Sequence, residues 1–290
     1  MRLSHDTSNH TRPLRSNGPF LLLPRCNRRR RIPLRSLNRS ALSEENEHLT
    51  GRKADRDAIR TFYDSLWKVS PRHTDALRRI EADTDVFRTL PPADHAKSRV
   101  LDAACGTGVS LPFLEKRGYR PVALDLSREA LLHIRRSQPR IPLVQGDIEA
   151  LPFRSHSFDH ALVFSALMFV DPRRTWTELL RVVRPHGTIQ GVEPLAGNPF
   201  WGLYRLLRRK YRSLPRYLSW NAFLESLPPG LPPPEIKGYY LFPVTILLKG
   251  RLRSFFFSCE QTLLTVFPFL SRFCWMLRFR IFTSPPSPHS

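Results

Sequence analysis

Acidic side chains and glycines recur where short apolar runs end, and these residues are the best suited to binding a ligand. Asp102 is followed by small residues that include Gly106 and Gly108, and these glycines let the backbone turn tightly. Asp125 comes nineteen positions after Gly106, close to the spacing at which an acidic residue meets ribose hydroxyls in nucleotide-binding βαβ units. Asp147 follows a third apolar run. We therefore expect the glycine turn and the three acids to hold a nucleoside-like ligand.

Structural roles compete with these binding roles. A Gly-x-Gly pair on its own is commonly a plain turn, and Asp125 could cap the following helix, although Ser127 could do so instead. We expect Cys105 to be a small packed residue rather than a catalytic thiol. We expect His160 and His186 to be packing and turn residues rather than general bases. No residue is assigned as a catalytic acid or base.

Strands and helices alternate through the middle of the chain. The apolar runs predict strands at residues 100–103, 121–125, 141–144, 158–164 and 188–193, with helices between them. Such alternation is typical of an α/β, doubly wound, Rossmann-like and mostly parallel sheet, with its ligand at the carboxyl ends of the strands. A sixth strand at 236–242, a helical insertion at 255–273 and a final edge strand at 276–282 complete a seven-stranded sheet.

Composition divides the chain into four regions. Residues 1–54 are a basic arm, with ten arginines and one acidic residue in the first forty positions, and we expect this arm to be disordered. We expect residues 55–97 to form a helical leader and residues 98–194 the ligand-binding core. Residues 195–290 supply the carboxyl-terminal strands and the hydrophobic helical insertion. The Arg-rich start also resembles an organellar transit peptide, with a tail of no function as the alternative.

Charge and cysteine content narrow the function classes. The formal net charge of +21 favours polyanionic partners, either nucleic acid or an anionic membrane face. The four cysteines include no CxxC pair and no His/Cys cluster, which argues against a disulfide framework and against a metal site. No run reaches the roughly 18 consecutive apolar residues of a membrane-spanning helix. We expect a cytoplasmic protein that can lie against a membrane, with organellar targeting by the N-terminus as the alternative.

Four stretches of the chain carry a family resemblance. They are VLDAACGTG at residues 100–108, VALDLS at 122–127, QGDIEALPF at 145–153 and LRVVRPHG at 180–187. In order and spacing they resemble the motifs of the class I S-adenosylmethionine-dependent methyltransferases, with a methyltransferase type 11-like domain. The resemblance covers about residues 55–194, just under half of the chain.

The resemblance implies S-adenosylmethionine as the cofactor and a set of residues that bind it. Asp102 is expected to accept from the amino group, Asp125 from both ribose hydroxyls, and Asp147 from the adenine amine. Tyr63 lies where family members often carry a tyrosine near the cofactor, and a role in a helix core is the alternative. The other implied contacts are the loop residues Ala104, Gly106, Thr107 and Gly108, the ring contacts Leu126 and Ile148, and Phe164 at the end of the fourth strand.

Two positions depart from the family pattern. Ala104 replaces the first glycine of the loop, and His186 replaces the glycine between Pro185 and Gly187. Cofactor binding should survive at Ala104 if the position needs no positive φ, whereas a positive φ there would weaken binding. A nicotinamide-dependent dehydrogenase is the main competitor, but its Gly-x-Gly-x-x-Gly pattern would need a third glycine at Leu111.

The methyl acceptor follows less directly from the sequence. Phenylalanines and leucines gather between residues 242 and 273, and apolar side chains flanked by arginines suit a membrane interface, whereas packing on the sheet is the structural alternative. We therefore expect methyl transfer to an O, N or C atom of a hydrophobic small molecule or lipid. The alternatives are RNA methylation, which the basic charge would suit, and a non-catalytic scaffold that keeps the fold.

Overall fold

The computed structural model describes residues 60–61, 64, 79–80, 82–91, 98–207, 217–246 and 248–284. All of them belong to one compact unit, Arg39–Ser290. The expected N-terminal arm, residues 1–54, lies outside the described residues, as do Tyr63 and most of the expected helical leader, residues 55–97. The division of the chain into an arm, a leader, a core and a carboxyl-terminal region therefore stays a prediction.

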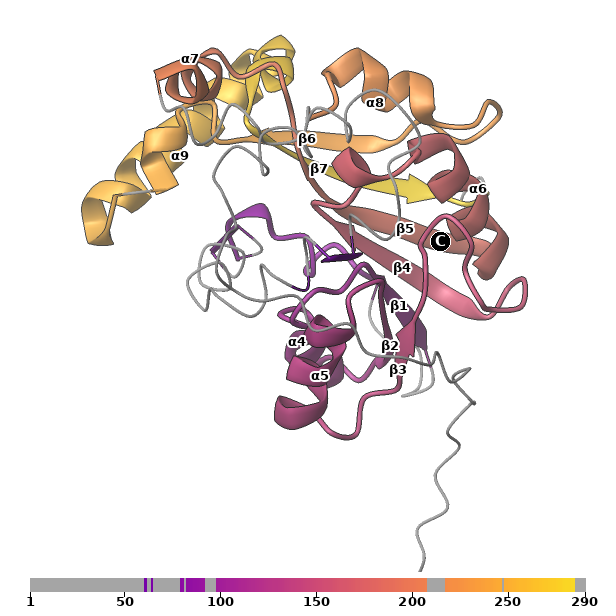
Figure 1. Cartoon of the computed structure of the whole chain (residues 1–290). Helices are drawn as coiled ribbons and strands as arrows, with labels where there is room; N and C mark the ends of the chain where they lie inside the picture. Colours follow the sequence, from indigo (N-terminus) through magenta and orange to yellow (C-terminus); the bar gives the residue numbers. More distant parts are fainter. Residues whose placement is uncertain are drawn as a thin grey trace, which may run out of the picture. The chain divides into compact units, whose positions relative to one another are not determined.

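A seven-stranded sheet forms the centre of the described unit (Figure 1). Its strands are β1 (Arg99–Ala103), β2 (Arg120–Asp125), β3 (Leu143–Gln145), β4 (Phe158–Phe164), β5 (Val183–Pro194), β6 (Glu235–Tyr239) and β7 (Met276–Phe282). The order across the sheet is β3-β2-β1-β4-β5-β7-β6. Neighbours from β3 to β5 run parallel, and β7 runs antiparallel to both β5 and β6. The predicted mostly parallel, doubly wound sheet is therefore confirmed.

Helices cover both faces of this sheet (Figure 1). They include α4 (Leu111–Lys116), α5 (Arg128–Ser137), α6 (Pro172–Val182) and α8 (Trp220–Ser226). Alternation along β1 sends Val100 and Leu101 to opposite faces. The face of Val100 packs against α4 and, next to it, Ala123 of β2 packs against α5. The face of Leu101 packs against α6 and α8. The result is a three-layer arrangement with the sheet in the middle.

Local sequence sets where two of these helices begin. Ser127 caps α5, because its hydroxyl accepts a hydrogen bond from the backbone N–H of Ala130 at 3.2 Å. Asp171 caps α6 by accepting from the backbone N–H of Arg173 at 3.0 Å. Both helices therefore begin at a hydrogen bond between residues two or three positions apart in the sequence.

The predicted strand at residues 276–282 is β7, but its predicted place at the edge of the sheet is wrong. β7 lies between β5 and β6, and β6 forms the edge. The reason is that Leu277, Phe279 and Ile281 are almost completely buried. The Phe279 ring packs edge-on against the ring of Trp176 in α6 at 5.6 Å, and β7 pairs with β5 along one side and with β6 along the other. β6 instead begins with exposed and half-exposed residues, which suit an edge strand.

The carboxyl-terminal helices also differ from the prediction. The sequence predicts one helical segment over residues 255–273, whereas the structure has α9 (Gly250–Val266) followed by the 3-10 helix η5 (Pro268–Phe273). Pro268 has no backbone N–H and disfavours a helical conformation at the residue before it, so α9 ends ahead of it. The short helix α8 is not predicted at all.

The last segments of the chain lie at the carboxyl edge of the parallel strands. β6 runs in the same direction as β5, so residues 240–275, which join β6 to β7, leave and re-enter the sheet at this edge. Helix α7 (Pro199–Leu207) follows the end of β5 at the same edge (Figure 1). Asn198 ties these segments together, because its Nδ2 donates to the carbonyl oxygens of Tyr240, Leu241 and Phe273 at 3.3, 3.0 and 2.8 Å.

Candidate functional site

A glycine loop, residues 104–110, joins β1 to α4 at the carboxyl edge of the sheet. Ala104, Gly106 and Gly108 have positive φ angles of 58°, 52° and 71°. A Cβ atom at Gly108 would meet the Leu111 side chain at 2.5 Å, so this position requires glycine. Ala104 adopts the left-handed conformation with a side chain, which costs about 1 kcal/mol relative to glycine. The chain therefore meets the condition under which we expect Ala104 to weaken ligand binding.

Asp125, at the end of β2, connects the glycine loop to the start of α5. Its Oδ2 accepts a hydrogen bond from the backbone N–H of Gly106 at 2.7 Å, and its Oδ1 accepts from the backbone N–H of Ser127 at 2.8 Å. Ser127 caps the helix, so Asp125 is a brace between three elements rather than the cap itself. Each carboxylate oxygen retains capacity for another donor.

Asp102 is buried beside Asp125, on the side of the sheet that carries α4. The hydroxyl of Ser110 donates a hydrogen bond to its Oδ2. Burial raises the pKa of Asp102 to about 7, and the nearby charge of Asp125 raises it too, whereas Ser110 lowers it. Burial likewise raises the pKa of Asp125 to about 6, against the opposing effect of backbone hydrogen bonds from Ser127, Gly106 and Leu126. Two neighbouring carboxyl groups therefore ionise only with difficulty, and a cation between them would favour their charged forms.

Ser110 and Asp64 contribute to this site without a signal in the sequence motifs. Asp64 accepts hydrogen bonds from the hydroxyl of Ser127 and, at 3.3 Å, from the backbone N–H of Glu129. Its charge also raises the pKa of Asp125. Ser110 could be suspected only from its place at the end of the glycine loop. Asp64 belongs to a distant part of the chain, so only the folded structure brings it to α5.

Asp147 follows β3, which pairs with β2. Its Oδ1 accepts from the backbone N–H of Glu149 at 2.9 Å, which turns the chain. Ile148 is only 5 % exposed and packs in the same core cluster as Leu124, so little of its surface remains for a ligand ring. Leu126 is half-buried, and its carbonyl oxygen accepts from Nε2 of Gln145 at 3.2 Å.

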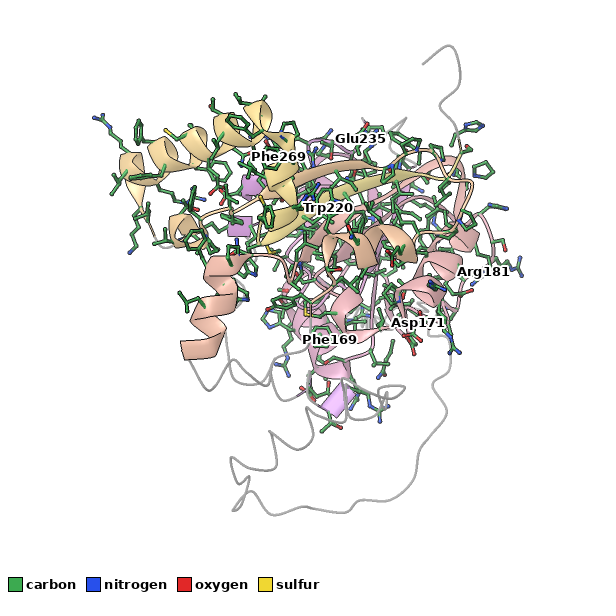
Figure 2. All side chains as sticks on the ribbon, turned by 90° about the horizontal axis from the view of Figure 1, so that it is seen from above. Phe169, Asp171, Arg181, Trp220, Glu235 and Phe269 are labelled. Atoms are coloured by element: carbon green, nitrogen blue, oxygen red, sulfur yellow. The ribbon has the colours of Figure 1, made fainter. Side chains whose placement is uncertain are left out.

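Arg181 of α6, labelled in Figure 2, holds the segment that follows Asp147. Its Nη1 donates to the carbonyl oxygen of Phe153 at 2.7 Å, and its Nη2 to that of Leu151 at 2.9 Å. Glu178 completes the arrangement, because its Oε2 accepts from the backbone N–H of Leu151 at 2.7 Å. These bonds give a physical reason why the third and fourth sequence motifs occur together.

The ends of β4 and β5 form the other half of the edge. The ring of Phe164 lies 5.6 Å from the ring of Phe87, a contact the sequence does not predict. Ser165 has a φ of 49°, which turns the chain sharply after the strand. Glu193 is buried and accepts from the backbone N–H groups of Ala166 and Leu167 at 2.8 and 3.2 Å. Burial raises the pKa of Glu193 to about 8.

The thiol and the two histidines considered in the sequence have structural contacts. Burial raises the pKa of the Cys105 thiol well above its usual value, so the thiol is poorly suited to act as a nucleophile. His160 is buried with Nδ1 2.8 Å from the Thr188 hydroxyl, and burial lowers its pKa to about 4. His186 turns the chain with a φ of 62° and contacts Ser284. The packing and turn roles expected for these residues are confirmed.

The glycine loop keeps polar capacity that the described part of the chain does not use. The Thr107 hydroxyl is buried without a hydrogen-bond partner among the described residues. Asp125 can accept two further donors, and the two buried acids favour a positively charged ligand. These features fit S-adenosylmethionine, which carries a sulfonium, an ammonium group and two ribose hydroxyls. Within the same described residues, no group of His, Cys, Asp and Glu is arranged to hold a metal ion.

Residues 101–190 match the family model of the methyltransferase domain. This span contains the glycine loop, the three acids and most of β5. Over these residues the chain is therefore similar to a methyltransferase domain, which agrees with the family resemblance of its four motifs.

Two named relatives illustrate the sequence match. Demethylmenaquinone methyltransferase of Renibacterium salmoninarum is 38 % identical over 120 residues, which cover 40 % of this chain and 50 % of that protein. Malonyl-[acyl-carrier protein] O-methyltransferase of Enterobacter lignolyticus is 35 % identical over 136 residues, which cover 47 % of this chain and 53 % of that protein. The chain spans about half the length of these curated relatives.

Solved structures extend the likeness in fold. A chain of the complex between the Haloferax volcanii Trm112 methyltransferase activator and a methyltransferase aligns with a TM-score of 0.54 and 18 % identity, over 77 % of this chain and 98 % of that one. The PH0226 protein from Pyrococcus horikoshii aligns with a TM-score of 0.51 and 16 % identity, over 77 % of this chain and 99 % of that one. The Rossmann-like methyltransferase fold thus reaches beyond the segment matched by sequence.

Proposed function

Starting from a chain that is similar to a methyltransferase domain over residues 101–190, we propose that it transfers a methyl group from S-adenosylmethionine to an O, N or C atom of a hydrophobic small molecule or lipid. One observation carries the proposal: the glycine loop and Asp125 are hydrogen-bonded to each other at the carboxyl edge of the sheet, with Asp102 buried beside them. Gly146 donates its backbone N–H to the Asp125 carbonyl at 3.1 Å, so Asp147 follows directly at the same edge.

Each acid has a distinct role in this proposal. Asp102 accepts a hydrogen bond from the cofactor's amino group, and its buried negative charge is favoured by the positive charges of the ligand. Asp125 accepts from the ribose hydroxyls with the lone pairs that Gly106 and Ser127 leave open. Asp147 accepts from the adenine amine. The remaining cofactor contacts come from the backbone of the glycine loop, from the Thr107 hydroxyl, and from Leu126 and Phe164, whereas Ile148 contributes only the small part of its surface that the core leaves exposed.

The chemistry places modest demands on the protein. When bound, S-adenosylmethionine supplies a methyl group on a sulfonium that is already a good leaving group. The chain's own residues therefore have to orient the two reactants and exclude water, and a dedicated base is optional. Glu193, whose raised pKa keeps it largely protonated at neutral pH, fixes the turn after β4 rather than removing a proton from the acceptor.

The hydrophobic acceptor is supported by the surface near the site. Phe242, Phe269 and Phe273 are exposed in the segment that joins β6 to β7, at the same edge as the glycine loop. The two named relatives act on different acceptors, so they do not select one for this chain. The exposed apolar side chains favour an acceptor that is itself apolar.

Calorimetry with the purified full-length chain tests the cofactor half of the proposal. We expect saturable binding of S-adenosylmethionine and of S-adenosylhomocysteine, and weaker binding of adenosine because it lacks the amino acid part that Asp102 would hold. Absence of binding in a sample that melts cooperatively would contradict the proposed function.

Methyl transfer into fractionated cell extract tests the acceptor. The full chain is incubated with S-adenosylmethionine that carries a radiolabelled methyl group, and the extract is separated into organic-soluble, RNA and protein fractions. We expect the label in the organic-soluble fraction, and Asp125→Ala protein as the control should label it far less at the same cofactor concentration. Label confined to RNA or to protein would replace the proposed acceptor class.

A further inference from the structure

Large apolar side chains gather in one part of the surface. Among the described residues, every well-exposed one except Leu224 lies either in α7 or between Phe242 and Phe273. The two in α7 are Phe200 and Leu203, and the rings of Phe200 and Phe242 lie 5.5 Å apart, which joins the two segments. We refer to these exposed side chains together as the apolar patch. Its area is concentrated rather than scattered, which marks an interaction site more often than chance exposure.

Helix α9 carries the central stripe of the patch. Leu252, Phe255, Phe256, Cys259 and Val266 are all exposed. At 3.6 residues per turn these positions fall within an arc of about 100°, so they share one face of the helix. Figure 2 shows α9 (yellow) extending away from the sheet with side chains projecting outward, and Phe269 is labelled in the 3-10 helix η5 that follows. The helix therefore presents a continuous apolar face to the outside.

Glu260 and Arg253, on the inner side of α9 next to the exposed stripe, hold the helix in its orientation, so it does not turn the stripe inward. Glu260 is 2 % exposed, and its carboxylate accepts from the backbone N–H groups of Tyr240 at 2.8 Å and Phe242 at 3.1 Å. Arg253 forms an ion pair with Asp83 on the same inner side. Rolling the helix would leave a buried carboxyl group and two backbone donors without partners, at a considerable cost in free energy.

The charges around the patch are of one sign. Lys249, Arg251 and Arg272 are exposed beside it and form no ion pair within the described residues. Glu260 is the single acidic residue between positions 242 and 273, and it is buried. Lys249 and Arg251 lie at the N-terminal end of α9, where the helix dipole disfavours cations. These two residues therefore do not serve the stability of the helix.

We propose that the apolar patch docks onto the surface of an anionic membrane, with α9 lying in the interface and its basic residues on the lipid headgroups. An exposed apolar face bordered by lysine and arginine is the pattern that binds such surfaces. No helix in the described part of the chain is both long and apolar enough to cross a bilayer. Contact through the patch is accordingly a surface attachment.

Docking would also place the membrane next to the carboxyl edge of the sheet, because residues 240–275 leave the sheet at the edge where the glycine loop lies. An apolar methyl acceptor could then reach the site from the bilayer without passing through water. This consequence rests on the proposed function, whereas the docking itself does not.

Flotation with vesicles tests the docking. The full chain, without cofactor, is mixed with vesicles of phosphatidylcholine alone or of phosphatidylcholine with phosphatidylglycerol. We expect binding to the anionic vesicles, and the double variant Phe255→Ser/Phe256→Ser should weaken it at least about tenfold. Leu224→Ser is the matched control, since Leu224 is an exposed apolar residue away from the patch, and it should bind as the unchanged chain does.

A double variant that reverses two basic charges tests how α9 is oriented on the membrane. Lys249→Glu/Arg251→Glu should weaken binding to the anionic vesicles by roughly thirty-fold or more, in line with the contribution of two basic residues near a membrane surface. Arg136→Glu/Arg140→Glu makes the same change in net charge on exposed residues at the end of α5 and beyond it, and it should have a much smaller effect. Equal losses in both double variants would overturn the proposal, because they would reflect net charge alone.

Two further measurements distinguish membrane docking from dimer formation and from cofactor binding. Light scattering without lipid tests for a dimer, and a dimer that Phe255→Ser/Phe256→Ser dissociates would assign the patch to a second copy and overturn the membrane proposal. Cofactor calorimetry on each variant keeps the two proposals apart. Loss of vesicle binding with unchanged cofactor affinity supports docking through the patch, whereas a folded chain that binds S-adenosylmethionine and no vesicle overturns docking alone.

Discussion

The glycine loop and the apolar patch lie at the same edge of the sheet, but they place their side chains in opposite environments. Around the loop, carboxyl groups are buried: Asp102 and Asp125 have raised pKa values because water is excluded from them. In the patch, phenylalanine rings such as Phe255 are exposed. Each arrangement is unfavourable until a partner of matching chemistry arrives, a cation in one case and an apolar phase in the other. The comparison indicates that cofactor binding and acceptor recruitment are separable properties of this chain.

The largest effect is expected at Asp125. Asp125→Ala removes the acceptor for two ribose hydroxyls and the brace on Gly106, so the affinity for S-adenosylmethionine should fall by roughly ten- to a hundred-fold. Calorimetry measures the affinity, and thermal melting verifies that the chain is folded. Asp125→Asn, which keeps one acceptor oxygen, should fall between the two.

The same variant sharpens the comparison through vesicle binding. Asp125→Ala should bind anionic vesicles as the unchanged chain does, because the patch does not involve this residue. A joint loss of cofactor and vesicle binding would show that the two regions are coupled and would contradict their separation.

A smaller effect is expected from pH. As pH falls through about 7 and about 6, Asp102 and Asp125 take up protons, so the affinity for the positively charged cofactor should fall about tenfold between about pH 8 and about pH 5. The stability of the cofactor-free chain depends on pH in the opposite direction: it falls as pH rises. The folded chain holds protons that the unfolded chain has released, so this contribution to the free energy of unfolding is present below about pH 4 and is lost as pH rises through about 7.

Calorimetry across this pH range measures the cofactor affinity, and thermal melting measures the stability of the cofactor-free chain. The variant Ser110→Ala tests the contribution of Asp102 in particular. The Ser110 hydroxyl lowers the pKa of Asp102, so its removal should move the loss of affinity to higher pH. Vesicle binding should stay level over the same range because lysine and arginine do not titrate there. An affinity that is independent of pH would argue against ionised Asp102 and Asp125 as cofactor ligands.

The smallest effect is expected where a non-glycine residue has a positive φ. Ala104→Gly removes the strain of the left-handed conformation and should raise the free energy of unfolding by about 1 kcal/mol, with equal or tighter cofactor binding. His186→Gly relieves the same kind of strain away from the glycine loop but loses the ring contact with Ser284, so its gain should be smaller and cofactor affinity unchanged. Denaturant unfolding with calorimetry distinguishes them, and a less stable Ala104→Gly chain would refute the strain argument.

Interactions between residues close together in the sequence made half of the carboxyl edge of the sheet predictable. Gly108 is required by its own backbone conformation and by the nearby Leu111, and Ser127 and Asp171 begin helices through bonds that reach two or three residues along the chain. Such features depend only on short stretches of sequence. The strands from β1 to β5 and their order along the chain could therefore be predicted.

The other half of this edge depends on contacts between residues far apart in the sequence, so it could not be predicted. The place of β7 depends on pairing with β5 and β6 and on the packing of Phe279 against Trp176, none of which is visible in a local pattern. Asp64 reaches α5 only in the folded chain. Phe267 ends α9 because a proline follows it, but whether α9 would turn its phenylalanines inward or outward was left open by their spacing. The buried Glu260 decides this question.

Asn198 has a consequence for how this protein can change over time. One amide group joins the start of α7, the turn after β6 and the end of η5, so this corner of the molecule depends on a single residue that cannot be exchanged freely. The outward positions of α9 are under no such constraint. Mutation could remodel what this surface recognises, one phenylalanine at a time, while the reaction chemistry at the neighbouring strand ends stays as it is.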